Sequence, residues 1–300
     1  MKYLSIGAMC AAVTFATPSF AHESYDARID NHAPIGVMAD HFHKKGEFMA
    51  SLRGMYMDMG DPVNTMMGPQ SMNMKMGMLG MMYAPSNKLT LMGMLNYVET
   101  SMDMTMMGNT AKMGANDIGD LTLSAMVPLI HTENRRFHIT LGTNVPLGNT
   151  DDTNPMGARM ALTMQTGTGS WGLKPSATYT QFFEGWSLGF QANANIWLED
   201  NKHNERMGDS FEVTSWVAAP ISDHIGLSAR IAYTDRNEVS GSMMKNLTDE
   251  RCALWSYAGA NFKVAGHRFA LEAGMPLWQN RGTNALDMGV SVTLGWQKAF

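Results

Sequence analysis

Apolar and polar residues alternate along most of this chain with a period of two. In the stretch 186–198, WSLGFQANANIWL, apolar side chains occupy every second position, and residues such as Gln191 and Asn193 lie between them. The stretches 137–145 and 225–233 repeat the pattern. Side chains of a strand point alternately to two faces, whereas a helix would scatter these residues around its axis. The pattern therefore predicts β-strands.

The same alternation predicts about twelve strands. Their expected ranges are 48–59, 72–84, 88–98, 117–130, 135–147, 171–183, 186–199, 209–219, 223–235, 253–264, 267–278 and 286–300. Most have an apolar face that continues for about ten residues, which suits a bilayer crossing better than the strands of about 5–6 residues usual in soluble sheets.

The connections between the predicted strands alternate in length. Short turns such as PSNK, HTENR and PISD follow every second strand. The connections between them are long, at 60–71, 99–116, 148–170, 200–208, 236–252 and 279–285. Outer-membrane barrels have this asymmetry, with short periplasmic turns and longer outer loops. We therefore expect an all-β fold, a transmembrane antiparallel up-and-down β-barrel of about 12 strands.

Aromatic residues gather at the short-turn ends of the predicted strands, where an interfacial girdle is expected. They are Phe48, Tyr83, Phe137, Phe182, Trp186, Phe262, Phe269, Trp296 and Phe300. The last strand, MGVSVTLGWQKAF, ends on Phe300, and a terminal aromatic is typical of chains received by the outer-membrane assembly machinery. We expect that machinery, the outer-membrane lipids and lipopolysaccharide as partners.

The first residues have the features of a secretory signal: Lys2, an apolar stretch at 4–15 and a small-x-small site ending at Ala21. The expected division is a signal peptide at 1–21, a periplasmic leader or plug segment at 22–47 and the barrel at 48–300. The net charge is −5 and basic runs are missing from the sequence, so nucleic acid is not an expected partner. The expected location is the outer membrane of a Gram-negative bacterium.

Several stretches carry a family resemblance. They are HAPIGVMADHFHKKGEFM at 32–49, MLGMMYAPSNKLTLMGML at 78–95, GDLTLSA at 119–125 and the terminal LGWQKAF. The chain resembles the outer-membrane transporters grouped under the MetA pathway of phenol degradation. This resemblance implies a monomeric barrel that passes small, often hydrophobic molecules, and it brings no substrate residues with it.

Methionine is the unusual component, with 31 of 300 residues, 20 of them between Met38 and Met113. When the apolar face of each strand is assigned to lipid, the methionines of the first three strands fall mostly on the lumen side. The residues expected to line the lumen and the solute path are Arg53, Met55, Met57, Met92, Met94, Gln191, Asn193, Asn195 and Arg230.

Two interpretations of the methionine patch stay open. Methionine adapts to irregular apolar surfaces, so the patch could line a channel for a small hydrophobic or aromatic solute. Thioethers also select Cu(I), which gives the alternative of a copper-binding or copper-handling envelope barrel. The candidate copper ligands are Met55, Met57, Met59, Met74, Met76 and Met104. No other cofactor is expected.

His41 and His43 in the motif DHFH have the spacing of strand neighbours and could also serve a metal. The alternative is a solvated or plug-like leader, because both precede the first predicted strand. The sequence places no nucleophile beside a base, so we expect a channel and not an enzyme.

Overall fold

A computed structural model gives the fold and describes residues 28–300, except 63, 65, 67, 107, 243–249 and 282–285. The predicted signal peptide at 1–21 and the first part of the predicted leader lie outside the described residues. The strands are β1 (Phe48–Gly60), β2 (Gly68–Ser86), β3 (Leu89–Met106), β4 (Asn109–His131), β5 (Arg135–Val145), β6 (Gly172–Phe183), β7 (Trp186–Trp197), β8 (Ser210–Ser222), β9 (Ile225–Arg236), β10 (Arg251–Val264), β11 (His267–Arg281) and β12 (Asp287–Ala299).

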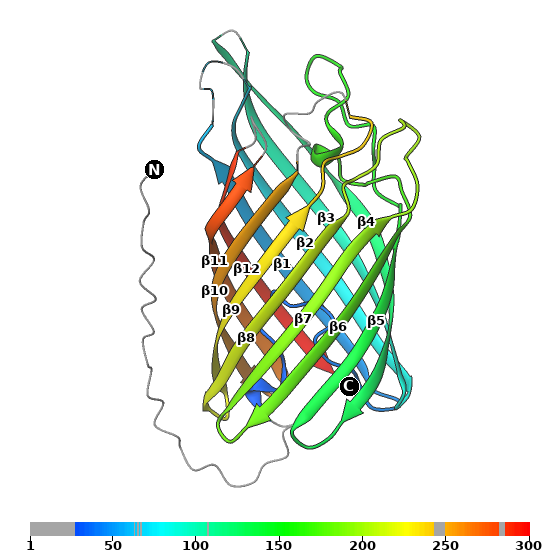
Figure 1. Cartoon of the computed structure of the whole chain (residues 1–300), viewed down its shortest axis with the longest axis vertical. Coiled ribbons are helices and arrows are strands. Elements are labelled where there is room, and N and C mark those ends of the chain that lie inside the picture. Colours follow the sequence, from blue (N-terminus) through cyan, green and yellow to red (C-terminus); the bar gives the residue numbers. More distant parts are fainter. Residues whose placement is uncertain are drawn as a thin grey trace, which may run out of the picture.

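These strands form one closed antiparallel barrel in which each strand pairs with its neighbours in the chain, and β1 closes the barrel against β12 (Figure 1). At the closure, Met49 pairs with Ala299 and Arg53 with Gly295. Closure leaves no open sheet edge, which is the condition for a sheet to span lipid. The prediction of a twelve-stranded up-and-down barrel is confirmed.

The outer surface is apolar because of the period-two pattern. In β1, Phe48, Leu52 and Tyr56 are exposed, whereas Met49 and Ser51 are buried. The other strands show the same alternation, and the exposed apolar side chains form the expected lipid-facing surface. Among the described residues, no helix is both long and apolar enough to cross a membrane.

One predicted loop is wrong. Residues 99–106 and 109–116 form the paired outer ends of β3 and β4, with Met102 opposite Met113 and Met106 opposite Asn109. This ribbon extends beyond the rest of the barrel at the end that carries the long connections (Figure 1). The other described connections there include 146–171 and 198–209, while the opposite end has turns as short as 184–185 and 265–266. We call these the long-loop end and the short-turn end.

One member of the predicted aromatic girdle is also misplaced. Phe182 is buried on the inner face, with the Arg136 guanidinium 4.8 Å from its ring centre. The neighbouring Phe183 is exposed instead and stacks on Trp186 at 4.1 Å between ring centres. With two aromatics in succession, the pattern alone could not assign the outward one.

Candidate functional site

The described part of the N-terminal segment, residues 28–47, lies inside the barrel near the short-turn end, and we call it the plug (Figure 1). It begins with a short 3-10 helix, η1 (Ile29–Asn31), and then runs without regular structure to β1. Ile29, Ile35 and Val37 are buried although they belong to no strand. Their burial shows that the barrel interior covers this segment.

Inward side chains of the barrel hold the plug through its main-chain carbonyls. Arg53 Nη1 donates to the carbonyls of Ile35 at 3.0 Å and Val37 at 3.2 Å. Further donors to plug carbonyls are Gln191 to Met38 at 2.8 Å, His138 to Ala39 at 2.8 Å and Arg268 to Ala33 at 2.7 Å. Buried carbonyls need such partners, because an unpaired one costs about 1–3 kcal/mol.

A buried ion pair between Arg230 and Glu272 contacts the plug at Gly36. Glu272 Oε2 accepts a hydrogen bond from the Gly36 amide at 3.1 Å, and the Arg230 guanidinium stacks 3.7 Å from the Tyr257 ring centre. A Cβ on residue 36 would lie 2.6 Å from Arg230 Nη2 and 2.7 Å from Glu272 Oε1. Glycine lets the plug backbone approach the ion pair this closely.

Apolar contacts complete the fit of the plug. Ala33 and Val37 pack against the buried Trp216 of β8. On the opposite side, Ala39 packs against a group of methionines from four strands, β1 to β4, which consists of Met49, Met82, Met92 and Met126. A gap of about 20 Å³ remains between the plug and this wall. The plug therefore closes tightly against the methionines of β1 to β4.

Further methionines form facing pairs across β1 and β2. Met55 lies opposite Met76, and Met57 opposite Met74, across β1 and β2. Side chains that face each other across an antiparallel pair have Cβ atoms about 4.5–5.5 Å apart. Met57 also packs against Ala232, Ala253 and Trp255. The inner wall is therefore lined by thioethers along these strands.

A second methionine group lies at the long-loop end, and we call it the outer methionine cluster. It consists of Met72, Met102, Met104, Met113, Met160 and Met164, packed around Ala115. Two of these residues come from the connection 146–171, which includes the short 3-10 helix η2 (Leu162–Met164). Asp120 anchors this connection by accepting from the amides of Gly148 and Thr168, each at 3.0 Å. The connection folds against β3 and β4.

The residues expected to bind copper fall into two places. Met55, Met57, Met74 and Met76 share the facing pairs of β1 and β2, with Met59 opposite Met72. Met104 belongs instead to the outer methionine cluster, away from Met55. The structure thus does not bring the expected ligand set together as one group.

The residues expected along the solute path lie mainly on the inner face. Met92 and Met94 line the gap beside the plug, and Arg53 and Gln191 donate to plug carbonyls. Arg230 pairs with Glu272, which accepts from the Gly36 amide of the plug. Asn193 donates to Glu212 at 3.3 Å, and Asn195 donates to Ser210 at 2.9 Å. Their role in solute passage stays a prediction.

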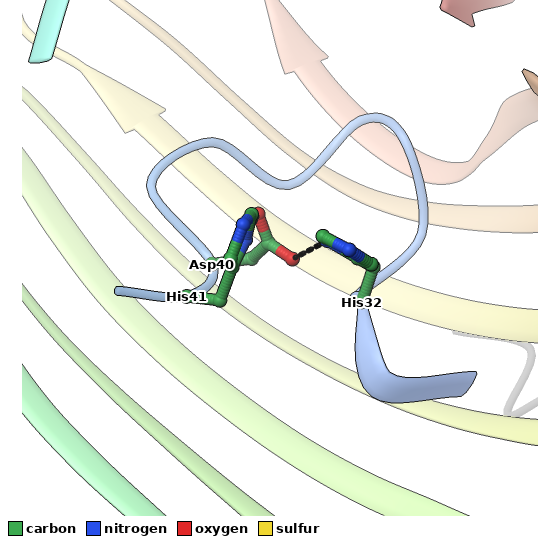
Figure 2. Close-up of side chains that lie close together, drawn as sticks. All are labelled: His32, Asp40 and His41. Atoms are coloured by element: carbon green, nitrogen blue, oxygen red, sulfur yellow. Dashed lines mark hydrogen bonds and ion pairs between the residues drawn. The ribbon is translucent and has the colours of Figure 1, made fainter. Parts of the chain in front are cut away.

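The plug also contains a cluster of histidines (Figure 2). His32, Asp40 and His41 point toward one another from the two ends of a loop, with the His32 and His41 ring centres 4.1 Å apart. His43 lies beside them, its ring centre 4.8 Å from that of His41. A cavity of about 500 Å³ at the short-turn end reaches all three histidines.

Burial sets the charge of this cluster. It lowers the pKa of His32 well below the ordinary value, and His41 and Arg268 lower it further. Burial and the neighbouring His41 lower the pKa of His43 to about 4. Burial alone would raise the pKa of Asp40, but His41 and the hydrogen bonds from the histidines hold it well below its ordinary value. Asp40 is therefore a carboxylate, and His32 and His43 are neutral at pH 7.

Sequence reasoning missed Glu272, Arg268 and Trp216, the barrel residues that meet the plug. The sequence did contain a signal for Glu272. In the apolar stretch RFALEAGM this carboxylate occupies one of the alternate positions that face the barrel interior. Nothing in the sequence indicates that its partner is Arg230, 42 residues away. The carbonyl contacts of the plug leave no sequence signal.

Comparison with known proteins supports the architecture. Residues 69–251 match the model of a family described as "Putative MetA-pathway of phenol degradation". An outer membrane channel from Pseudomonas putida F1 has a similar structure, with a TM-score of 0.68 and 14% identity over 87% of this chain and 98% of that chain. The β domain of the Bordetella autotransporter BrkA has a TM-score of 0.53 and 11% identity over 86% and 100%. A comparison with curated proteins gives no match.

At these identities the likeness to the two solved structures is a likeness of fold. The closed barrel and its apolar outer face agree with that likeness. The fold is that of the barrels that span the outer membrane of Gram-negative bacteria.

Proposed function

Because the chain belongs to the MetA-pathway family of phenol degradation, we propose that it is an outer-membrane channel for a small hydrophobic or aromatic solute. Passage needs no catalysis in this proposal. The observation that carries it is the thioether wall of β1 to β3, which faces the plug across a narrow gap. Methionine side chains are flexible and make favourable contacts with aromatic rings.

The barrel size fits a narrow path. Side chains fill eight-stranded barrels, and barrels of 16 strands or more leave an aqueous channel. A barrel of twelve strands lies between these classes. In this one the plug occupies the short-turn end, which we assign to the periplasm, so a solute passes only when the plug shifts. The contacts at Arg53, Gln191 and Gly36 are then the contacts that break during opening.

Flux through the purified protein tests this proposal. Proteoliposomes with a lipopolysaccharide outer leaflet would be loaded from outside with a radiolabelled monoaromatic alcohol or with a sugar of similar size. We expect protein-dependent uptake of the aromatic probe to exceed that of the sugar. We also expect steady conductance in planar bilayers from a variant that lacks residues 28–43, because the plug is gone.

A substitution in the wall makes the test specific. Replacing Met55, Met92 and Met94 with serine should lower aromatic uptake, whereas Met156→Ser, at an exposed loop position, should not. Heat-modifiable migration on gels checks that each variant is folded. The proposal is wrong if neither the parent nor the plug-deleted barrel conducts or passes the aromatic probe.

One observation favours a second candidate function, Cu(I) binding. The outer methionine cluster gathers six thioethers at the long-loop end. Soft thioether ligands select Cu(I) over harder ions. We treat this as the alternative to packing, since a cluster around Ala115 also buries apolar surface. A titration of Cu(I) against the parent and a leucine variant distinguishes the two.

A further inference from the structure

The histidine cluster of the plug contains buried nitrogen atoms without partners. Among the described residues, His41 Nε2 and His43 Nε2 make no hydrogen bond, and the contact of His32 Nδ1 is an ion pair with Asp40 Oδ2 at 3.6 Å. The side chains of His41 and His43 are only 7% and 6% exposed. A buried polar atom left unpaired costs about 1–3 kcal/mol, so two such Nε2 atoms in one small volume require an explanation.

Two carboxylates orient the histidines. Asp40 Oδ1 lies 2.9 Å from His41 Nδ1, and Glu47 Oε2 lies 3.3 Å from His43 Nδ1. Each Nδ1–H can donate to its carboxylate, which leaves the lone pair on Nε2 free. Histidines that ligate metals are commonly oriented in this way by a carboxylate on the other ring nitrogen. The unpartnered atoms are thus the ones a metal would need.

We propose that His32, Asp40 and His41 bind one divalent transition-metal ion of the zinc class, with His43 as a further donor. One ligand atom from each of the three residues lies within 4.8 Å of the others. In a tetrahedral zinc site with bonds of about 2.0–2.1 Å, ligand atoms are roughly 3.4 Å apart. Side-chain rotations that shorten the longest separation by about 1.4 Å would complete the site.

The surroundings restrict which metal can bind. Imidazole nitrogen suits zinc, copper, iron and nickel. Calcium and magnesium are held mainly by carboxylate and carbonyl oxygens, and this site offers few of those. The site therefore selects a metal bound through nitrogen donors.

The location of the site gives the metal a structural effect. Figure 2 shows His32 at one end of a loop and Asp40 with His41 at the other. A metal bound to both ends would close residues 33–39, the loop whose carbonyls are held by Arg53, Gln191 and Arg268. The ligands come together only when the loop is closed, so the free energy of metal binding stabilises the closed conformation of the loop. If the proposed channel function holds, the metal keeps the plug in place.

Metal binding can be measured without any flux. The full mature protein, purified in detergent with a histidine-free tag and stripped with chelator, would be titrated with Zn²⁺ by calorimetry. A parallel titration with Co²⁺ would record the visible absorption that reports tetrahedral coordination. We expect one ion per chain and tetrahedral Co²⁺ bands. A parent that binds no Zn²⁺ and gives no such bands overturns the proposal.

Variants assign the binding to these residues. The double variant His32→Gln, His41→Gln should lose the stoichiometric site. Asp40→Asn removes a ligand and the orienting partner of His41, so it should weaken the site by more than the about 10-fold lower limit for an orienting partner alone. The matched control is His224→Gln, which removes an imidazole from an exposed turn and should bind like the parent. Equal binding by the parent and the double variant would place the metal elsewhere and end the proposal.

A measurement on the parent covers the case in which the double variant does not fold. Carbethoxylation of histidines, mapped by mass spectrometry, should slow at His32 and His41 when Zn²⁺ is present and stay unchanged at His224. Equal protection at all three positions would count against the site. Conductance is recorded separately. If Zn²⁺ binds but does not change the frequency of channel opening, the metal site is supported and its effect on the plug is refuted.

Discussion

Replacing Gly36 with alanine should loosen the plug while leaving the barrel wall unchanged. The new methyl group would lie 2.6 Å from Arg230 Nη2 and 2.7 Å from Glu272 Oε1, well inside contact distance. These atoms terminate flexible side chains, but their movement is restricted. Arg230 and Glu272 pair with each other in the buried interior, Arg230 stacks on Tyr257, and Glu272 binds the Gly36 amide.

The cost follows from overpacking. Extra methyl groups in a well-packed interior typically cost about 1–3 kcal/mol. If the plug relieves the clash by leaving the ion pair, this free energy is lost only from the plugged state. Since 1.4 kcal/mol corresponds to a factor of ten, the ratio of open to plugged molecules should rise by about 5- to 150-fold.

Hydrogen–deuterium exchange of the purified barrel measures this ratio directly. Amides in residues 33–39 that are protected by the plugged state should exchange faster in Gly36→Ala by the same factor. The amides of β9 and β11, which carry the ion pair, should keep their protection. Planar-bilayer recordings should show a matching rise in the frequency of opening.

The matched control is Gly77→Ala in β2, where an added Cβ would have nothing within 4 Å. This variant should exchange like the parent throughout. If Gly36→Ala gives the same exchange as Gly77→Ala, the ion pair moves aside at little cost. The plug would then not depend on the close approach at Gly36.

Four further predictions concern the plug, the methionines, the C-terminus and the topology. Arg53→Met keeps an apolar side chain but removes two hydrogen bonds to plug carbonyls, each worth about 1.5–3 kcal/mol because the donor is charged. Amide hydrogen exchange in residues 33–39 should therefore be faster, and an unchanged rate would refute this prediction. Replacing Met55, Met57, Met92 and Met94 together with leucine should lower the free energy of unfolding by less than about 1.5 kcal/mol per site. If this variant binds Cu(I) as well as the parent does, these four methionines do not bind copper. Deleting Phe300, whose amide and carbonyl both bond to Phe48, should lower the heat-modifiable folded fraction, and normal assembly would count against its anchoring role. In a Cys252→Ser background, Asn154→Cys should react with an impermeant reagent on intact cells and Asn87→Cys should not; the reverse result would invert the orientation.

The sequence predicts the membrane-spanning part of the strands well, because lipid contact on one face imposes the alternation. It misses the outer ends of β3 and β4 for the same reason. There the outward positions carry Glu99, Ser101 and Asp103, so the apolar pattern stops although backbone pairing continues. Lys75, an imperfect fit on an apolar face, pairs with Glu99 at 2.8 Å on the outer surface. The pattern reports lipid contact, and strand pairing extends beyond it.

The plug is harder to predict. Residues 28–47 have no periodicity, and their contacts join positions far apart in the chain, such as Gly36 and Glu272, 236 residues away. The motif DHFH is visible in the sequence, but His32 joins it only because residues 33–39 form a loop. The alternation of inward and outward positions along each strand does assign Arg53, Gln191 and Arg230 to the inner face. What those side chains meet there depends on the folded plug.

The barrel binds the plug largely through main-chain carbonyls, so few side chains of the plug are needed to retain these hydrogen bonds. A carbonyl at Val37 or Met38 accepts the same hydrogen bond whatever side chain the residue carries. Substitutions along this loop can therefore alter the surface presented to a solute while the retaining contacts persist. Gly36, Ala33 and Val37 are exceptions, because the missing side chain of Gly36 and the packing of Ala33 and Val37 against Trp216 are themselves part of the fit. The plug is thus a place where this barrel can acquire a new selectivity without rebuilding its wall.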